Sequence, residues 1–154
     1  MTRRQRIRHD DPRAPIRPGD DGINRLVLEA HPDVQAIYRY GTWGTDAQRP
    51  DSDVDVAVLL PHGAAMRADR WQWHLLAVSI AGALGAEHAD LINLRRADTS
   101  LQAEILRTGR LTYSGDDDAR LRFESLVLSM YQKLNAERAG IRAAIVGSGR
   151  TPAP

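Results

Sequence analysis

Two carboxylates near the middle of the chain have the spacing of a metal-binding pair. Asp53 and Asp55 flank Val54, and the segment continues with apolar residues through Leu60. In an extended strand such side chains point to one face, with Cα atoms roughly 6.5 to 7 Å apart. Crowding like charges on an apolar strand is costly without a cation, and Mg2+ prefers carboxylate oxygens. The pattern therefore predicts a divalent metal site, for which Mg2+ is the natural candidate.

Size and composition limit what can surround this pair. The 154 residues, 42% hydrophobic and 27% charged, are typical of one globular domain. The absence of Cys excludes disulfides and thiol chemistry, and no apolar run approaches the length of a membrane span. The basic start lacks the apolar segment of a secretory signal. We therefore expect a cytoplasmic location.

Composition also divides the chain into three predicted parts. Residues 1–19 form a basic leader rich in Arg, Pro and Asp, which cannot bury enough apolar area to become ordered. Residues 20–146 form the folded domain, and residues 147–154 form a disordered tail. A short basic run is more often a solvated tail than a binding arm. Any contact with nucleic acid would go through this leader.

Hydrophobic periodicity predicts alternating helices and strands inside the domain. The expected helices are 20–30, 65–84, 99–107 and a long one beyond 118, and the expected strands are 34–40, 52–60, 88–94 and 109–113. Asp20 or Asp21 is expected to cap the first helix, and Thr99 or Ser100 the third. This order predicts an α+β (α/β-like) fold with helices on a sheet, not a bundle or a sandwich.

Apolar and aromatic side chains on the predicted helices favour ordinary packing. The last helix carries one apolar stripe, formed by Phe123, Val127, Met130, Leu134, Ile141 and Ile145. Such a stripe is most often simple core, with partner docking as a minority addition. Trp71, Trp73 and His74 are expected to pack or to form a partly exposed face, and stacking on a nucleobase is the less frequent use. The five His residues lack metal-ligand spacing, which argues against zinc.

The glycine turn and the acidic strand together resemble a known signature. Tyr40 to Thr45, followed by Arg49 to Leu59, is similar to the Gly-Ser-x10-Asp-x-Asp motif of polymerase-β-like nucleotidyltransferases, in their minimal nucleotidyltransferase (MNT) version. Thr42 replaces the usual Ser and keeps its hydroxyl. Residues 89–94, 101–105 and 108–113 resemble the third-carboxylate strand and the elements after it. The resemblance implies a polymerase-β-type core, with a small mixed sheet flanked by helices and a long C-terminal helix.

The resemblance also implies roles for individual residues. The expected catalytic and metal-binding residues are Asp53, Asp55 and Asp90. They would hold two Mg2+ ions about 3.5 to 4 Å apart, and Asp90 would help take the acceptor's proton. The expected nucleotide-binding residues are Gly41, Thr42, Gly44 and Arg49. Glycine lets backbone N–H groups approach phosphate oxygens closely, and Arg49 would add positive charge, although its segment can equally be a plain turn.

MNT antitoxins pair with HEPN toxins, and this likeness implies a function. We expect a Mg2+-dependent nucleotidyltransferase that moves AMP from ATP to a tyrosine hydroxyl of a partner HEPN RNase toxin and so neutralises it. Two alternatives stay open: a non-catalytic antitoxin that acts by binding its toxin, and a nucleotidyltransferase with a small-molecule, aminoglycoside-like acceptor. The short chain leaves little sequence for a dedicated small-molecule pocket.

Overall fold

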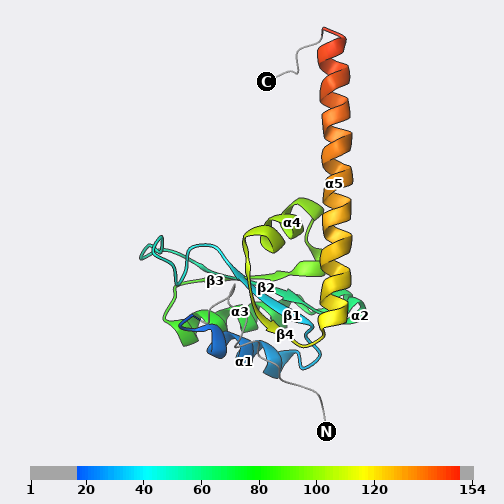
Figure 1. Cartoon of the computed structure of the whole chain (residues 1–154). Helices are drawn as coiled ribbons and strands as arrows, with labels where there is room; N and C mark the ends of the chain where they lie inside the picture. The colour runs from blue at the N-terminus through cyan, green and yellow to red at the C-terminus, as the bar shows by residue number, and fades with distance from the viewer. Residues whose placement is uncertain (1–16, 150–154) are drawn as a thin grey trace.

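The protein is built on one four-stranded sheet with helices on both faces (Figure 1). The computed structural model describes residues 17–149. The strands are β1 (Ala36–Tyr40), β2 (Val54–Leu59), β3 (Ala89–Asn93) and β4 (Arg110–Ser114). The helices are α1 (Asp20–Ala30), α2 (His62–Arg67), α3 (Arg70–Leu84), α4 (Thr99–Thr108) and α5 (Asp117–Gly147), with a 3-10 turn, η1, at Leu94–Arg96. The predicted α+β class is confirmed.

The sheet is mixed, and its strands follow the order β3-β2-β1-β4. β1 is antiparallel to both β2 and β4, whereas β2 and β3 are parallel. Parallel neighbours cannot be joined by a tight hairpin, so α2 and α3 provide the crossover between them. The end of β1 and the starts of β2 and β3 therefore meet at one end of the sheet.

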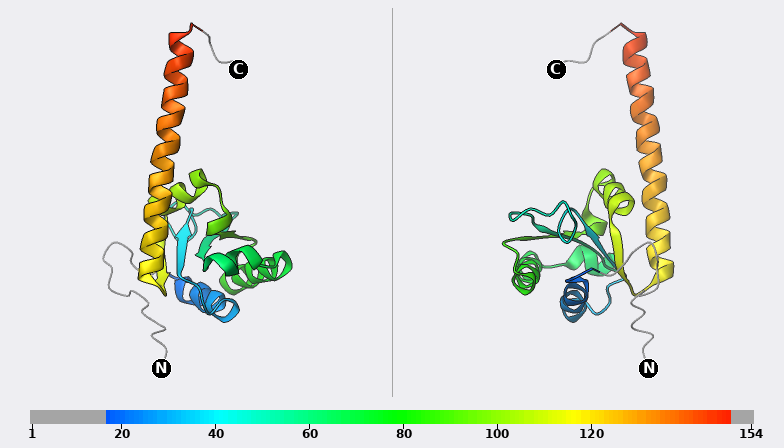
Figure 2. Two further views of the ribbon diagram at one scale, coloured as in Figure 1. Left: turned by 90° about the vertical axis from the view of Figure 1, so that its right-hand side faces the viewer. Right: turned by 60° about the vertical axis from the view of Figure 1, so that its left-hand side comes forward.

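Helices cover both faces of the sheet (Figure 2), and an apolar layer lies on each face. On one face α1 and α3 cover the sheet, and this layer is centred on Ile23, Val27, Val56, Leu76 and Ile80. On the other face α4 and the start of α5 cover it, and this layer is centred on Ala57, Leu59, Ile105, Phe123 and Val127. The two layers follow from the strands, because successive strand side chains point to opposite faces.

Asp20 anchors α1 to the sheet instead of capping the helix. The N-cap is Gly19, and no side chain accepts a hydrogen bond there. Asp20 is buried, and its Oδ1 accepts a hydrogen bond from Arg39 Nη1 at 2.8 Å. Arg110 of β4 donates to both carboxylate oxygens. Because a buried carboxylate needs charged partners, this side chain ties α1 to β1 and β4, and its predicted role as a cap is wrong.

Two other helix boundaries differ from the expectation. The single helix predicted for 65–84 is two helices, which are separated at Ala68 and Asp69. Asp69 has an extended backbone, and its carboxylate accepts a backbone N–H from the first turn of α3. The cap of α4 is likewise Asp98 rather than Thr99 or Ser100. In both cases an aspartate carboxylate takes a free N–H of the helix start, which interrupts or begins the helix.

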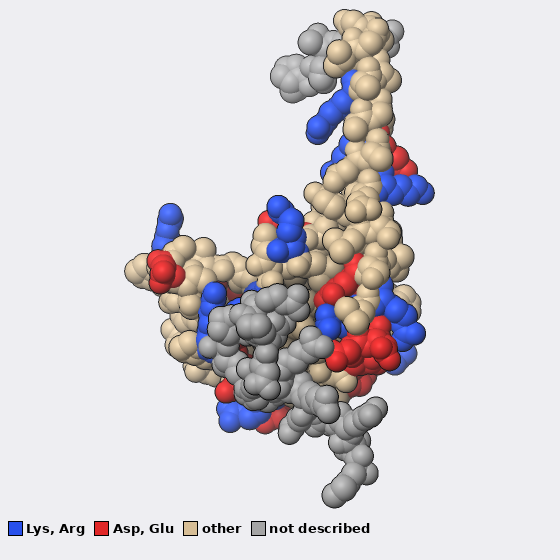
Figure 3. All heavy atoms as spheres, viewed as in Figure 1, with Lys and Arg blue, Asp and Glu red and all other residues tan. Residues whose placement is uncertain are grey.

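Only the first half of α5 packs on the sheet. Phe123 and Val127 are buried, whereas Met130 is 47% and Ile141 59% exposed. The 31-residue helix is about 46 Å long at 1.5 Å per residue, so its second half extends beyond the body (Figures 1 and 3). Figure 3 shows mostly uncharged side chains on the visible face of this extension. The expectation that the stripe is core is confirmed at Phe123 and Val127 and is wrong from Met130 onward.

Both ends of the chain are predicted to be disordered. Most of the predicted leader, residues 1–19, and most of the predicted tail, residues 147–154, lie outside the described residues. Their disorder and the leader's contact with nucleic acid stay predictions. Between residues 17 and 149, no helix combines the length and the apolar character needed to cross a membrane.

Candidate active site

Three side chains form a row across the end of the sheet where β1 stops and β2 and β3 start. Tyr40 pairs with Asp55 in the antiparallel register, and Asp55 pairs with Asp90 in the parallel register. Directly paired residues of neighbouring strands point to the same face of a sheet. That face is the one covered farther along by α4 and α5, since Ala57 and Leu59 have the same parity as Asp55. The fold therefore brings two predicted carboxylates together and adds a phenol beside them.

The row concentrates negative charge. The pKa of Asp55 is raised to about 6, first by burial and then by the charges of Asp90 and Asp53, while Arg39 opposes the shift. The pKa of Tyr40 is also raised, first by burial and then by the charges of Asp90 and Asp55. Both shifts mean that additional negative charge is disfavoured at this site. A divalent cation would remove that penalty.

The turn after β1 requires glycine at position 41. Its φ is +74°, in the left-handed region, and a Cβ there would lie 2.0 Å from Oδ2 of Asp55. No other residue type can make this approach, because every other one carries that carbon. The glycine of the motif therefore lets the turn close directly against the first carboxylate of the row.

The loop between β1 and β2 is held by its own polar side chains. The hydroxyls of Thr42 and Ser52 are 3.1 Å apart, and the backbone N–H of Arg49 donates to Ser52 Oγ at 2.8 Å. The N–H of Gly44 donates to Gln48 Oε1 at 2.8 Å, so this predicted phosphate donor is engaged within the loop. Because Ser52 lies two residues before β2, its contact with Thr42 places Thr42 next to the start of that strand.

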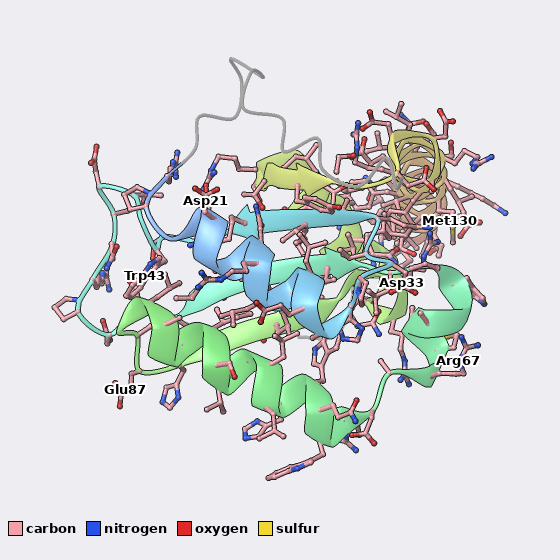
Figure 4. All side chains as sticks on the ribbon, turned by 90° about the horizontal axis from the view of Figure 1, so that it is seen from below. Asp21, Asp33, Trp43, Arg67, Glu87 and Met130 are labelled. Carbon is pink, nitrogen blue, oxygen red and sulfur yellow. The ribbon has the colours of Figure 1, made fainter. Side chains whose placement is uncertain are left out.

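The other predicted loop residues lie at the surface. Arg49 is exposed, and so is Asp53, which directly precedes β2. Trp43 packs against the layer formed by α1 and α3, at the same end of the molecule as Glu87 and at the opposite end from Met130 (Figure 4). Trp43 therefore anchors the loop to the body on the face opposite to the carboxylates.

The three predicted metal ligands are not gathered around one point. Among the residues that the structure describes, no group of three acidic or imidazole side chains is arranged to hold a metal. Asp55 and Asp90 are register neighbours, whereas Asp53 lies outside the strand. Asp53 and Asp90 are exposed, so rotation about their side-chain bonds is unhindered by packing. The donor set, three carboxylates with an unneutralised charge, fits a hard cation such as Mg2+.

Sequence reasoning missed three features of this region. Tyr40 belongs to the motif and Ser52 directly precedes Asp53, but no sequence pattern gives either residue a role. A groove of about 480 Å3 also runs beside β3 from Asp90, with Trp73 in its wall. The expectation that Trp73 packs is confirmed, because its indole N–H donates to the Leu91 carbonyl at 2.7 Å. The groove could not be read from the sequence, because α3, β3 and the segment from Arg96 to Leu101 form it together.

The fold and the motif define the class of protein. Residues 25–118 match the family of polymerase beta nucleotidyltransferases, and the chain belongs to that family. The chain is also 35% identical, over 125 residues, to the protein adenylyltransferase MntA of Shewanella oneidensis. That alignment covers 79% of this chain and 84% of the relative.

Solved structures agree with this assignment. The chain is similar to the toxin-antitoxin complex MntA-HepT, with a TM-score of 0.64, 30% identity, and coverage of 83% of this chain and 97% of that one. A toxin-antitoxin structure with AMP-PNP matches with a TM-score of 0.68, 31% identity, and coverage of 82% and 98%. A third match is a tri-AMPylated Shewanella oneidensis HEPN toxin in complex with MNT antitoxin, with a TM-score of 0.64, 30% identity, and coverage of 83% and 96%.

Proposed function

We propose that this protein is a Mg2+-dependent adenylyltransferase that moves AMP from ATP onto a tyrosine hydroxyl of a HEPN-type toxin and so neutralises it. The observation that carries the proposal is the row formed by Tyr40, Asp55 and Asp90 beside the turn at Gly41. The relatives support the donor and the acceptor. One is a protein adenylyltransferase, one was solved with AMP-PNP, and one complex contains an AMPylated HEPN toxin.

Each transfer of AMP in the proposed reaction is one displacement at phosphorus. The phenol oxygen of the toxin's tyrosine forms a bond to the α-phosphorus of ATP as the bond from that phosphorus to the bridging oxygen breaks. Pyrophosphate leaves with the bond's electrons, and the phenol proton passes to Asp90, which is exposed at the start of β3. The turn at Gly41 and Thr42 would orient the triphosphate through backbone N–H groups and the threonine hydroxyl.

Asp53, Asp55 and Asp90 are the residues that would hold two Mg2+ ions. Bound Mg2+ would neutralise part of the phosphate charge and would make the acceptor phenol easier to deprotonate. The ordinary pKa of a phenol is near 10. The raised pKa of Asp55 supports this assignment, because its carboxylate ionises more readily once a cation offsets Asp90 and Asp53. Arg49 would add charge near the phosphates from the exposed loop.

A transfer assay tests the proposal. The protein, the partner toxin, Mg2+ and ATP labelled on the α-phosphate are incubated together, and label on the toxin is measured. We expect label with the wild-type protein and none with Asp53→Asn combined with Asp55→Asn. The matched control is Asp51→Asn, an exposed carboxylate of the same loop, which should keep the label. If the wild type leaves the toxin unlabelled but still blocks its RNase activity, the protein acts by binding alone.

A further inference from the structure

The groove beside β3 lies against an unpaired strand edge. β3 is at one end of the sheet order, and within residues 17–149 no strand pairs with its outer side. The groove has a volume of about 480 Å3. One wall is α3 with the residues before it, and the other is the segment from Arg96 to Leu101. Asp90 lines the groove and also belongs to the row that it forms with Tyr40 and Asp55. The groove is therefore continuous with the candidate active site.

The register shows which backbone groups of β3 face the groove. Val54 N–H donates to the His88 carbonyl, so residues 88, 90 and 92 exchange hydrogen bonds with β2. The intervening residues, Ala89 and Leu91, direct their backbone groups outward. The Leu91 carbonyl accepts the Trp73 indole N–H, which confirms this orientation. The Trp73 indole therefore covers the outer side of β3 at Leu91, and the outward N–H of Ala89 is the donor available to an additional strand.

An added strand would place one of its side chains beside the catalytic row. Neighbouring strands lie about 4.8 Å apart, and directly paired residues share a face. A residue paired with Asp90 from the outer side would therefore point to the face that carries Tyr40 and Asp55. If that residue is a tyrosine, its side chain extends over the same face as the carboxylate that we assign to take the proton.

The walls of the groove indicate what such a segment contains. Two basic side chains, Arg70 and Arg96, line it together with His74. Both arginines are exposed at the surface. Apolar side chains, among them Leu101, complete the lining. The groove therefore suits an extended segment with acidic residues along its length.

We propose that the groove beside β3 is the docking site for the tyrosine-bearing segment of the protein acceptor, which binds as an extended acidic strand on the outer edge of β3. A backbone carbonyl of the segment accepts a hydrogen bond from the Ala89 N–H, its acidic side chains face Arg70 and Arg96, and its tyrosine lies opposite Asp90. This inference rests on the proposed function, because it names where that reaction's acceptor binds.

Two variants test the docking site by steady-state kinetics of AMP transfer to the toxin. Arg96→Glu reverses one charge of the groove, and its matched control is Arg25→Glu, an exposed arginine of α1 on the opposite face. We expect Arg96→Glu to raise the KM for the toxin about tenfold, which corresponds to roughly 1.4 kcal/mol. The KM for ATP should change less than about twofold, and Arg25→Glu should alter neither.

The second variant removes a backbone donor. Ala89→Pro deletes an outward N–H at the first residue of an edge strand, where proline is tolerated and the ladder to β2 is retained. Its control, Ala89→Ser, keeps the N–H. We expect the proline variant alone to raise the KM for the toxin, and circular dichroism with thermal unfolding verifies that it is folded.

The outcomes separate the two proposals. If the wild type transfers AMP to the toxin but both groove variants keep its KM, the docking site is refuted and the proposed function stands. If Arg96→Glu raises the KM for ATP instead, the groove binds the nucleotide and the docking site is likewise refuted. If the wild type transfers no AMP, both proposals fail.

Discussion

Replacing Asp55 by Asn should stabilise the protein in the absence of metal. The pKa of this carboxyl is raised from 3.8 to about 6, chiefly by burial and by Asp90. At 1.36 kcal/mol per pKa unit, this difference corresponds to roughly 3 kcal/mol of destabilisation above pH 6. Because Asp55 is only half-buried, solvent screening reduces the expected effect to on the order of 1 to 2 kcal/mol.

The pH dependence has a definite sign. Between about pH 4 and pH 6 the folded wild type binds more protons at Asp55 than the unfolded chain does. Its free energy of unfolding therefore falls as the pH rises through this window and stays lower above it. The Asn variant does not titrate, so its advantage should be small near pH 4 and complete near pH 7.

Urea unfolding followed by circular dichroism at these pH values, without divalent ions, measures the effect. Asp51→Asn, an exposed carboxylate in the preceding loop, is the control and should show no such advantage. Added Mg2+ should then stabilise the wild type and not the Asp55 variant, because a ligand of the folded state adds RT ln(1 + [L]/Kd). A variant that is less stable than the wild type at pH 7, or an advantage independent of pH, would refute the proposed charge cluster.

Three further changes have expected outcomes. Gly41→Ala should abolish AMP transfer and lower the free energy of unfolding by more than about 2 kcal/mol. Gly44 also has a positive φ, +76°, but no atom lies near the position of an added Cβ, so Gly44→Ala should lower the free energy of unfolding by only about 1 kcal/mol. Asp20→Ala should cost about 3 to 5 kcal/mol in urea unfolding, because it leaves two guanidinium groups without their shared carboxylate. Deleting residues 136–154 should change the unfolding free energy by less than about 0.5 kcal/mol, since this part of α5 is almost entirely exposed; a larger loss would show that it packs.

Local signals in the sequence were enough for most elements of the fold. The four strands were predicted because β-branched and apolar residues alternate or run between turn residues, and this signal needs no knowledge of distant contacts. The break between α2 and α3 was missed because neither Gly nor Pro stands between Ala65 and Trp71, and the break comes from the capping hydrogen bond of Asp69. The role of Asp20 was missed because its partners, Arg39 and Arg110, are distant in sequence.

By itself the sequence determined the family, the glycine turn and the pair Asp53 and Asp55, because all three depend on spacing within one short segment. Only the tertiary structure decided that Tyr40, Asp55 and Asp90 form one row, that Gly44 donates within its own loop, and that a groove follows the outer edge of β3. The physical reason is that strand order and register are set by burial of whole faces of the sheet. Residues far apart in the chain contribute to that burial together, so no local pattern can specify it.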